Sequence, residues 1–202
     1  MGMNTFEVDV MYDFVGDFAD ANGLTATIRA LPFAKEKHAG QFRKGEKLVP
    51  YVSHPLTMAC HAISMGLIED DLLAAILLHD VCEDCGVSPA NLPANRSVQN
   101  AVLLVTKEEG ESKRKYFSQI GENRIASMVK LIDRCHNVSQ MSLAFSREKL
   151  GKYIHETEEY ILPLLAASKD KWPEHSQQYF LLEYQIVSAV QSVKALLERK
   201  DI

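Results

Sequence analysis

The stretch Leu72-Leu73-Ala74-Ala75-Ile76-Leu77-Leu78-His79-Asp80-Val81-Cys82-Glu83-Asp84 places an imidazole and three carboxylates directly after an apolar helical run. Ionised carboxylates are rarely buried unless they are paired or bind a metal. A histidine beside an aspartate offers one nitrogen ligand and one oxygen ligand, a mixture that divalent transition metals accept. The alternative is a helix end whose charged side chains face water, and His-Asp dipeptides are common enough to keep that alternative open.

Two residues elsewhere in the chain could complete a metal site. His54 comes just before a helical segment, and Asp133 ends a second apolar helical pattern. Together with His79 and Asp80 they supply two nitrogen and two oxygen ligands, which leaves coordination positions open for water and substrate. Open positions are typical of catalytic metal sites, whereas structural sites are closed.

The order of these residues resembles the signature of the HD-domain metal phosphohydrolases. The finer detail is similar to the hydrolase domain of the RelA/SpoT alarmone enzymes and to the small stand-alone (p)ppGpp hydrolases. A bare His-Asp pair is weak evidence, but six ordered blocks between about residues 25 and 165 carry the resemblance. These blocks are Phe33 to Lys44, Pro50 to Pro55, Leu77 to Asp84, Val105 to Lys107, Lys130 to Asn137, and Glu156-Thr157 with Tyr160 and Pro163 behind it.

The resemblance implies a metal-dependent enzyme that removes the 3′-pyrophosphate from a guanosine alarmone such as (p)ppGpp. It assigns Glu83 and Asp84 to positioning the nucleophile and handling protons, which is general acid–base work. Glu83 follows His79 by one helical turn, so it could lie on the same face, beside the reacting water. The alternative for this pair is two solvated carboxylates at a helix end.

Substrate contacts are expected from five further residues. Arg43 and Lys44 are cationic, and a guanidinium binds phosphate in a bidentate way; a solvated charge run is the alternative. The resemblance implies that Asn137 and Thr157 help to hold the nucleotide. Tyr51 is a candidate for the pocket wall, although a core tyrosine explains it equally well.

Mixed histidine and carboxylate ligands suit manganese or iron, with zinc possible, and the resemblance implies Mn²⁺. Cys82 and Cys85 stand where the family has an apolar residue and a threonine, and the region after Tyr160 also departs from the family pattern. These departures affect the expected substrate preference more than the catalysis. A redox or zinc role for the C-x-x-C pair would need a thioredoxin-like context or a second pair, and neither is visible.

Two other functions stay open. One is an HD phosphohydrolase that acts on another nucleotide, such as an adenosine analogue of the alarmone. The other is a nucleotide-binding regulator that kept the metal site and lost turnover. The intact Glu83-Asp84 pair argues against the regulator, because a pure binder has no need of acid–base groups.

The 202 residues, 47% hydrophobic and 24% charged, have an ordinary globular composition. We expect one HD-type domain over 1–202, with an N-terminal arm (1–24), the core motifs (25–165) and a C-terminal amphipathic helix (174–200). The chain ends too soon for the synthetase domain of full-length RelA/SpoT enzymes, so synthesis is not expected. The net charge of −5 argues against a general nucleic-acid or membrane surface. No secretory signal or membrane span is visible, which favours the cytoplasm.

Helical spacing is abundant and strand alternation is scarce, which predicts an all-α bundle. Val10, Phe14 and Phe18 give the arm helical spacing and predict that it packs on the main body or on a partner subunit. The C-terminal helix carries an apolar stripe that forms either core or the surface of a homodimer. The other expected helices span about 25–38, 54–65, 69–79, 98–105, 125–132 and 150–161.

Overall fold

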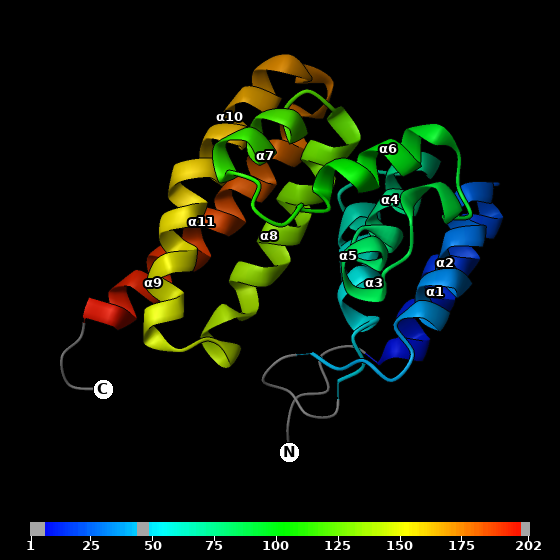
Figure 1. Ribbon diagram of the computed structural model, residues 1–202, viewed down its shortest axis with the longest axis horizontal. Coiled ribbons are helices and arrows are strands. Elements are labelled where there is room, and N and C mark those ends of the chain that lie inside the picture. The colour runs from blue at the N-terminus through cyan, green and yellow to red at the C-terminus, as the bar shows by residue number, and fades with distance from the viewer. Residues whose placement is uncertain (1–6, 44–48, 199–202) are drawn as a thin grey trace. The chain divides into compact units, whose positions relative to one another are not determined.

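The computed structural model describes residues 7–43 and 49–198. Within these two ranges the structure contains helices and no β-strand (Figure 1). An isolated antiparallel bridge pairs Phe42 with Pro50. The prediction of an all-α helical fold is therefore confirmed. Contacts divide the chain into two compact units, residues 1–111 and 112–202. A single domain over the whole chain stays a prediction.

The first unit is built around the apolar stretch that follows residue 71. Helix α4 (Asp70–Leu78) packs against α2 (Thr25–Lys37), α3 (Ser53–Ser64) and α6 (Arg96–Val105), and its seven residues from Leu72 to Leu78 are all buried. The unit also contains α1 (Val8–Ala21), the short helix α5 (Val81–Cys85) and a 3-10 turn at Pro89–Asn91. Because α4 is central, the charged residues that follow it begin at the edge of the core.

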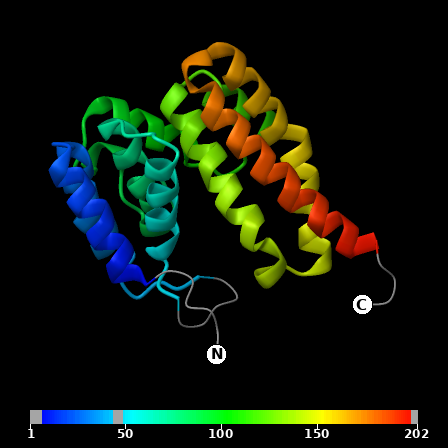
Figure 2. The same cartoon turned by 180° about the vertical axis from the view of Figure 1, so that it is seen from behind.

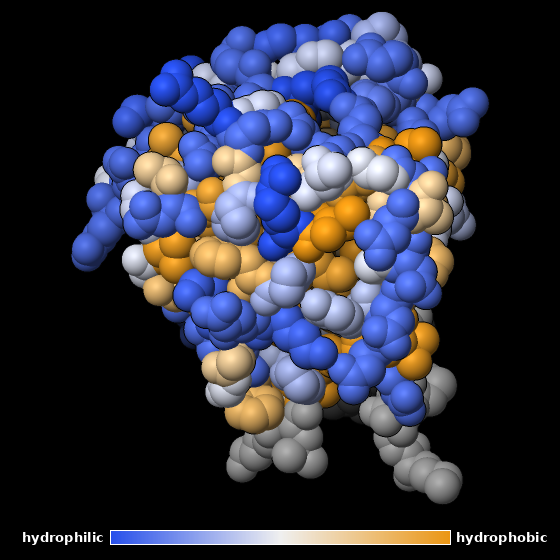
Figure 3. All heavy atoms as spheres, turned by 90° about the vertical axis from the view of Figure 1, so that its right-hand side faces the viewer, coloured by the Kyte–Doolittle hydropathy of each residue, from blue (hydrophilic) through white to orange (hydrophobic). Residues whose placement is uncertain are grey.

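Helix α1 packs on α2 and α3, so the prediction that the arm packs on the main body is confirmed. Its buried side chains are Met11, Val15 and Ala19. Each follows by one residue a member of the apolar stripe that the sequence predicted, Val10, Phe14 and Phe18. Val10 is 62% exposed and Phe14 is 45% exposed. Figure 3 shows hydrophobic residues among hydrophilic ones on the side where α1 and α2 lie. Two apolar stripes one residue apart share the helical period, so periodicity alone could not choose between them.

Asp70 caps the N-terminus of α2 from the first turn of α4. Its carboxylate accepts hydrogen bonds from the backbone amides of Ala26 (2.9 Å) and Thr27 (2.8 Å) and from the hydroxyl of Thr27 (2.8 Å). The first amides of a helix have no partner within the helix, and the residue before α2, Leu24, cannot supply one from its side chain. Asp70 therefore joins two core helices, beyond its effect on the dipole of its own helix.

Replacing Asp70 by Ala is expected to lower the free energy of unfolding by about 1–2 kcal/mol, the usual loss for a helix cap. Urea unfolding followed by circular dichroism measures this change. Asp71→Ala is the matched control, because it removes one exposed hydrogen bond from Asn95 and should cost less than about 0.5 kcal/mol. Equal losses in the two variants would show that the cap does not stabilise α2.

The second unit contains α7 (Lys113–Ile120), α8 (Arg124–Ala144), α9 (Arg147–Glu156), a π-helical turn (Thr157–Ile161), α10 (Leu162–Lys171), a 3-10 turn (Pro173–His175) and α11 (Ser176–Glu198). Helices α8 and α11 lie side by side, as Figure 2 shows from behind. The C-terminal amphipathic helix is confirmed, with Tyr179, Leu182, Ile186, Val190 and Val193 buried. Phe180, which the sequence placed on the same stripe, is 59% exposed. Within the described ranges, no helix is long and apolar enough to span a membrane.

Candidate metal centre and catalytic pair

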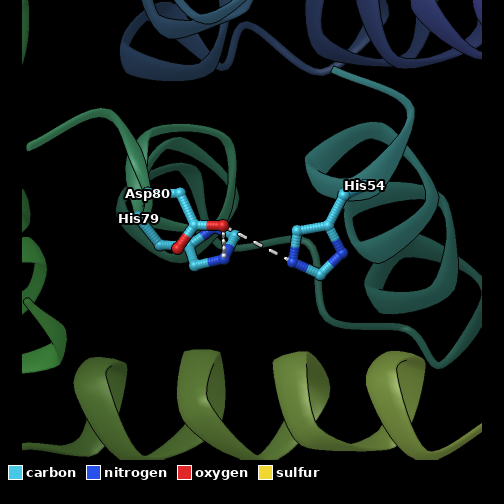
Figure 4. A group of neighbouring side chains, drawn as sticks. All are labelled: His54, His79 and Asp80. Carbon is cyan, nitrogen blue, oxygen red and sulfur yellow. Dashed lines mark ion pairs between the residues drawn. The ribbon is translucent and has the colours of Figure 1, made fainter. Parts of the chain in front are cut away.

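Three of the four predicted metal ligands lie together in the first unit. His54 is the second residue of α3, His79 directly follows α4, and Asp80 directly precedes α5. One nitrogen from each histidine and one carboxylate oxygen all lie within 4.8 Å of one another. Figure 4 shows the imidazole of His79 beside the Asp80 carboxylate and the imidazole of His54 turned toward the same carboxylate from α3.

The donor atoms of this cluster fit a divalent metal ion. Nε2 of His79 lies 3.0 Å, and Nε2 of His54 3.6 Å, from Oδ2 of Asp80. Nδ1 of His79 lies 2.8 Å from the carbonyl oxygen of Ile76, which can only accept, so Nδ1 carries the proton and the lone pair of Nε2 faces the cluster. A backbone carbonyl that fixes the far nitrogen in this way is typical of metal-binding histidines. Both histidines are buried, so their rings are held by the surrounding packing.

Tyr51 lies beside the cluster. Its hydroxyl donates a hydrogen bond of 2.5 Å to Oδ2 of Asp80. Burial raises the pKa of Tyr51 far above its usual value, and the negative charges of Asp80 and Asp84 raise it further, so the hydroxyl keeps its proton. The tyrosine that was predicted to line a substrate pocket thus orients a candidate metal ligand, and its contact with substrate stays a prediction.

Glu83 and Asp84 lie on α5, within one helical turn of Asp80. The amide of Asp84 donates to the carbonyl of Asp80 (2.8 Å), and Gly86 ends the helix with a positive φ of 66° that favours glycine. Both side chains are exposed, so water and substrate can reach them. The amide of Lys107, just after α6, lies 3.5 Å from Oε2 of Glu83. The pair thus follows the metal ligands on a short, solvent-facing helix.

Asp133, the fourth predicted ligand, lies on α8 in the second unit and is buried. Its carboxylate lies 2.9 Å from Nζ of Lys130 and accepts a 2.5 Å hydrogen bond from the amide of Asn137. Burial lowers the pKa of Lys130, but the charge of Asp133, the neighbouring Tyr116 and the hydrogen bond to Asp133 together raise it above its usual value, so the ammonium stays charged. Its role as a ligand stays a prediction from the sequence.

The sequence interpretation missed Arg134, whose side chain is buried between α8 and α9. Its guanidinium donates to the hydroxyl of Thr157 (3.1 Å), forms an ion pair with Glu156 and stacks on the ring of Tyr153 at 3.9 Å. Burial alone would raise the pKa of Glu156, but hydrogen bonds from Lys113 and Arg134 lower it below its usual value. The available signal was a charged residue inside a stretch of buried apolar ones.

Thr157 begins the π-helical turn and is fully buried. Its hydroxyl donates to the carbonyl of Tyr153 (2.8 Å) and accepts from Arg134, so both of its hydrogen-bonding directions are used within the protein. Asn137 is half-buried, and its side-chain amide donates a hydrogen bond to the carboxylate of Asp133. Nucleotide contacts from Thr157 and Asn137 therefore stay predictions.

Arg43 is half-buried, and its guanidinium carbon lies 5.8 Å from the centroid of the Tyr51 ring. Lys44 lies outside the described residues. The thiols of Cys82 and Cys85 are free, and burial raises their pKa values, that of Cys82 to about 11. Both thiols are therefore protonated at neutral pH, and a redox or metal role for them has no support from their geometry.

No family model matches the chain, but individual relatives do. It is 36% identical over 147 residues to a guanosine-3′,5′-bis(diphosphate) 3′-pyrophosphohydrolase of Aquifex aeolicus, over 67% of this chain and 20% of that protein. It is 31% identical over 144 residues to the bifunctional (p)ppGpp synthase/hydrolase SpoT of Escherichia coli, over 65% of this chain and 20% of that protein. The chain thus spans about a fifth of the length of these relatives.

A solved structure, described as a metazoan ortholog of SpoT that hydrolyses ppGpp, has a similar fold. Its TM-score is 0.64 at 22% sequence identity, over 83% of this chain and 94% of that one. The helical fold and the His-His-Asp cluster define the class as an HD-type domain. Within that class, the sequence matches confirm the predicted resemblance and assign the chain to the RelA/SpoT-type hydrolase domains.

Proposed function

We propose that the protein hydrolyses the 3′-pyrophosphate of a guanosine alarmone such as (p)ppGpp, giving GDP or GTP and pyrophosphate. The observation that carries the proposal is the His54–His79–Asp80 cluster, followed within one turn by the exposed carboxylates of Glu83 and Asp84. The named activities of the relatives support the choice of substrate. The cofactor proposed is Mn²⁺, with Fe²⁺ or Zn²⁺ as the alternatives that the same ligand types accept.

His54, His79 and Asp80 would hold the metal ion, and Asp133 is proposed as the fourth ligand from its sequence block. When bound, a divalent ion polarises a phosphate oxygen and the attacking water. Tyr51 holds the Asp80 carboxylate in a fixed orientation through its hydroxyl. The protein thereby contributes a fixed set of donors, because each histidine is buried and Nδ1 of His79 is tied to the backbone.

Hydrolysis adds water across the bond between the ribose 3′ oxygen and the pyrophosphate. One proton leaves the attacking water, and one must reach the 3′ oxygen as pyrophosphate departs. The carboxylates of Glu83 and Asp84 are suited to both transfers because they are exposed and lie on the turn after Asp80. Two neighbouring carboxylates can accept one proton and donate another without moving the helix.

Substrate binding is proposed for Arg43 with Lys44, for Asn137 and Thr157, and for the ring of Tyr51. A guanidinium near the cluster's tyrosine suits the phosphate oxygens of an anionic nucleotide, which the net charge of −5 would otherwise repel. We further propose a cytoplasmic protein with a small-molecule nucleotide as its partner and with neither nucleic acid nor membrane bound. A homodimer belongs to the same proposal, although the apolar stripe of α11 that could have formed its surface is buried within the second unit.

Purified protein supplied with Mn²⁺ is expected to convert ppGpp to GDP and pyrophosphate, and a chelator should abolish the conversion. Product chromatography with a coupled pyrophosphate assay measures the rate. The adenosine analogue of the alarmone, at the same concentration, is expected to react more slowly. Tight ppGpp binding without turnover would favour a nucleotide-binding regulator over an enzyme. Faster hydrolysis of the adenosine analogue would make that analogue the proposed substrate instead of ppGpp.

A further inference from the structure

We infer that Gln41 is a positioning residue, whose side-chain amide holds the end of α5 and thereby sets the direction of the Glu83 and Asp84 carboxylates. The catalytic part of the inference rests on the proposed function, because the direction of these carboxylates matters for catalysis only if they transfer protons. The anchoring of α5 is a separate physical statement that can be measured without substrate.

Helix α5 is too short to hold its own shape. It spans five residues, Val81–Cys85, whereas isolated helices shorter than about 12 residues are marginal in water. The last carbonyls of any helix also lack donors within the helix. Contacts from outside α5 must therefore fix the direction of the carboxylates that it carries.

Gln41 supplies such contacts to the last turn of α5. Its Nε2 lies 3.4 Å from the carbonyl oxygen of Asp84 and 3.6 Å from Sγ of Cys85. The thiol of Cys85 in turn donates to the carbonyl of Lys37, at the end of α2 (3.3 Å). Because Lys37 and Gln41 belong to one segment, that segment anchors two neighbouring residues of α5.

His38 determines which way the amide of Gln41 points. Nδ1 of His38 lies 2.8 Å from Oε1 of Gln41, so the amide oxygen is used by the ring and Nε2 is left to face α5. The His38 side chain is nearly fully buried, and its ring lies against that of Tyr51 with 4.8 Å between centroids. A ring packed in this way has little room to turn, so the amide keeps its orientation.

The backbone of Gln41 reaches the metal cluster as well. Its carbonyl accepts a 2.9 Å hydrogen bond from the amide of Tyr51, whose hydroxyl donates to Asp80. Gln41 is thus connected to both ends of the turn from Asp80 to Asp84, where a metal ligand and a proton-transfer group lie one helical turn apart. Loss of its amide should loosen α5 without removing any ligand of the cluster.

Gln41→Met, which keeps the length of the side chain and removes its amide, tests the inference. We expect kcat to fall about tenfold, a loss comparable in size to the contribution of one modest hydrogen bond, with KM changed less than about twofold. Amide hydrogen exchange in residues 81–86, measured without metal or substrate, is expected to become faster. Gln41→Glu, which keeps an acceptor for His38 but loses the donor to Asp84, should give the same two changes.

Gln99→Met is the matched control in the same unit, because the Gln99 amide donates to the carbonyls of Ala90, Leu92 and Ala94. It should speed exchange around those residues and leave kcat unchanged. Unchanged exchange at 81–86 in both Gln41 variants would overturn the anchoring. Faster exchange with unchanged kcat, or a raised KM at constant kcat, would overturn the positioning role. A wild-type protein without turnover would overturn the proposed function alone, and the exchange data would still decide the anchoring.

Discussion

Replacing Glu83 by Gln is expected to lower kcat for ppGpp hydrolysis by about 10²- to 10⁴-fold, the usual contribution of a general acid–base group. The amide keeps the size of the side chain but cannot accept the proton that leaves the attacking water. Because Glu83 is exposed on α5 and is not one of the clustered ligand atoms, the affinity for Mn²⁺ should stay within about threefold of the wild type. Steady-state kinetics and isothermal titration with Mn²⁺ measure the two quantities.

Glu109→Gln is the matched control, since Glu109 is an exposed carboxylate of the same unit outside the cluster and α5. It should leave both kcat and metal affinity unchanged. Asp84→Asn, in the same helix, separates the two carboxylates: a large loss in only one variant assigns the rate-limiting proton transfer to that residue. Turnover that survives both substitutions would contradict acid–base work by this pair. A loss of Mn²⁺ affinity equal to the loss of kcat would instead make Glu83 a metal ligand.

The sequence was most informative where the physics is local. An apolar run long enough for two helical turns must be buried, and residues 72–78 are. The spacing of Val98, Ala101, Val102 and Val105 likewise predicted one buried face, and all four side chains are buried. The adjacency of His79 and Asp80 and the turn to Glu83 are also local, so their grouping followed from the chain alone.

The sequence was least informative where a side chain acts on a distant part of the chain. Asp70 reads as a charge in its own helix, yet it caps α2, more than 40 positions earlier. The hydroxyl of Tyr51 reaches Asp80 across 29 positions, and that contact turns a candidate wall of the pocket into a group that orients a ligand. Nothing in the local pattern of either residue specifies its partner, because the partner is chosen by the packing of helices.

The burial of Arg134 is a further case in which contacts between distant residues decide where a side chain lies. Charged residues are rarely buried without partners, and the local sequence around Arg134 names no partner for it. The structure satisfies the guanidinium with Glu156, Thr157 and the ring of Tyr153, all from the segment of α9 and the turn after it. Thr157, which the family resemblance connects with the nucleotide, is thereby also part of the internal hydrogen bonding of the second unit.

Replacing His79 by Ala is expected to abolish specific Mn²⁺ binding and to lower kcat/KM by roughly 10³-fold or more, since the ion supplies several kcal/mol of transition-state stabilisation. His79 contributes a buried nitrogen, and the carbonyl of Ile76 holds its ring in place. Metal binding can be measured without turnover, because a bound ion stabilises the folded state by about 2.7 kcal/mol at 100 times its Kd. Thermal unfolding with increasing Mn²⁺ should therefore shift in the wild type and not in the variant.

His155→Ala is the matched control, because His155 is an exposed histidine paired with Glu159 on the surface of the second unit. It should keep the wild-type response to Mn²⁺. After chelation, added Mn²⁺ should restore activity to the wild type and to His155→Ala but not to His79→Ala. A normal thermal shift in His79→Ala would contradict the metal site at this cluster.

Asp133→Asn tests the fourth ligand by the same thermal shift. The variant keeps the shape of the side chain, but Lys130 and Asn137 donate to different oxygens of Asp133, so the single amide oxygen can keep only one of these two hydrogen bonds. If Asp133 is a ligand, the Mn²⁺ response should weaken by about 10-fold or more in apparent Kd, because an amide oxygen is a poorer ligand than a carboxylate. An unchanged response would remove Asp133 from the ligand set and leave the His54–His79–Asp80 cluster as the whole of the protein's contribution to the ion.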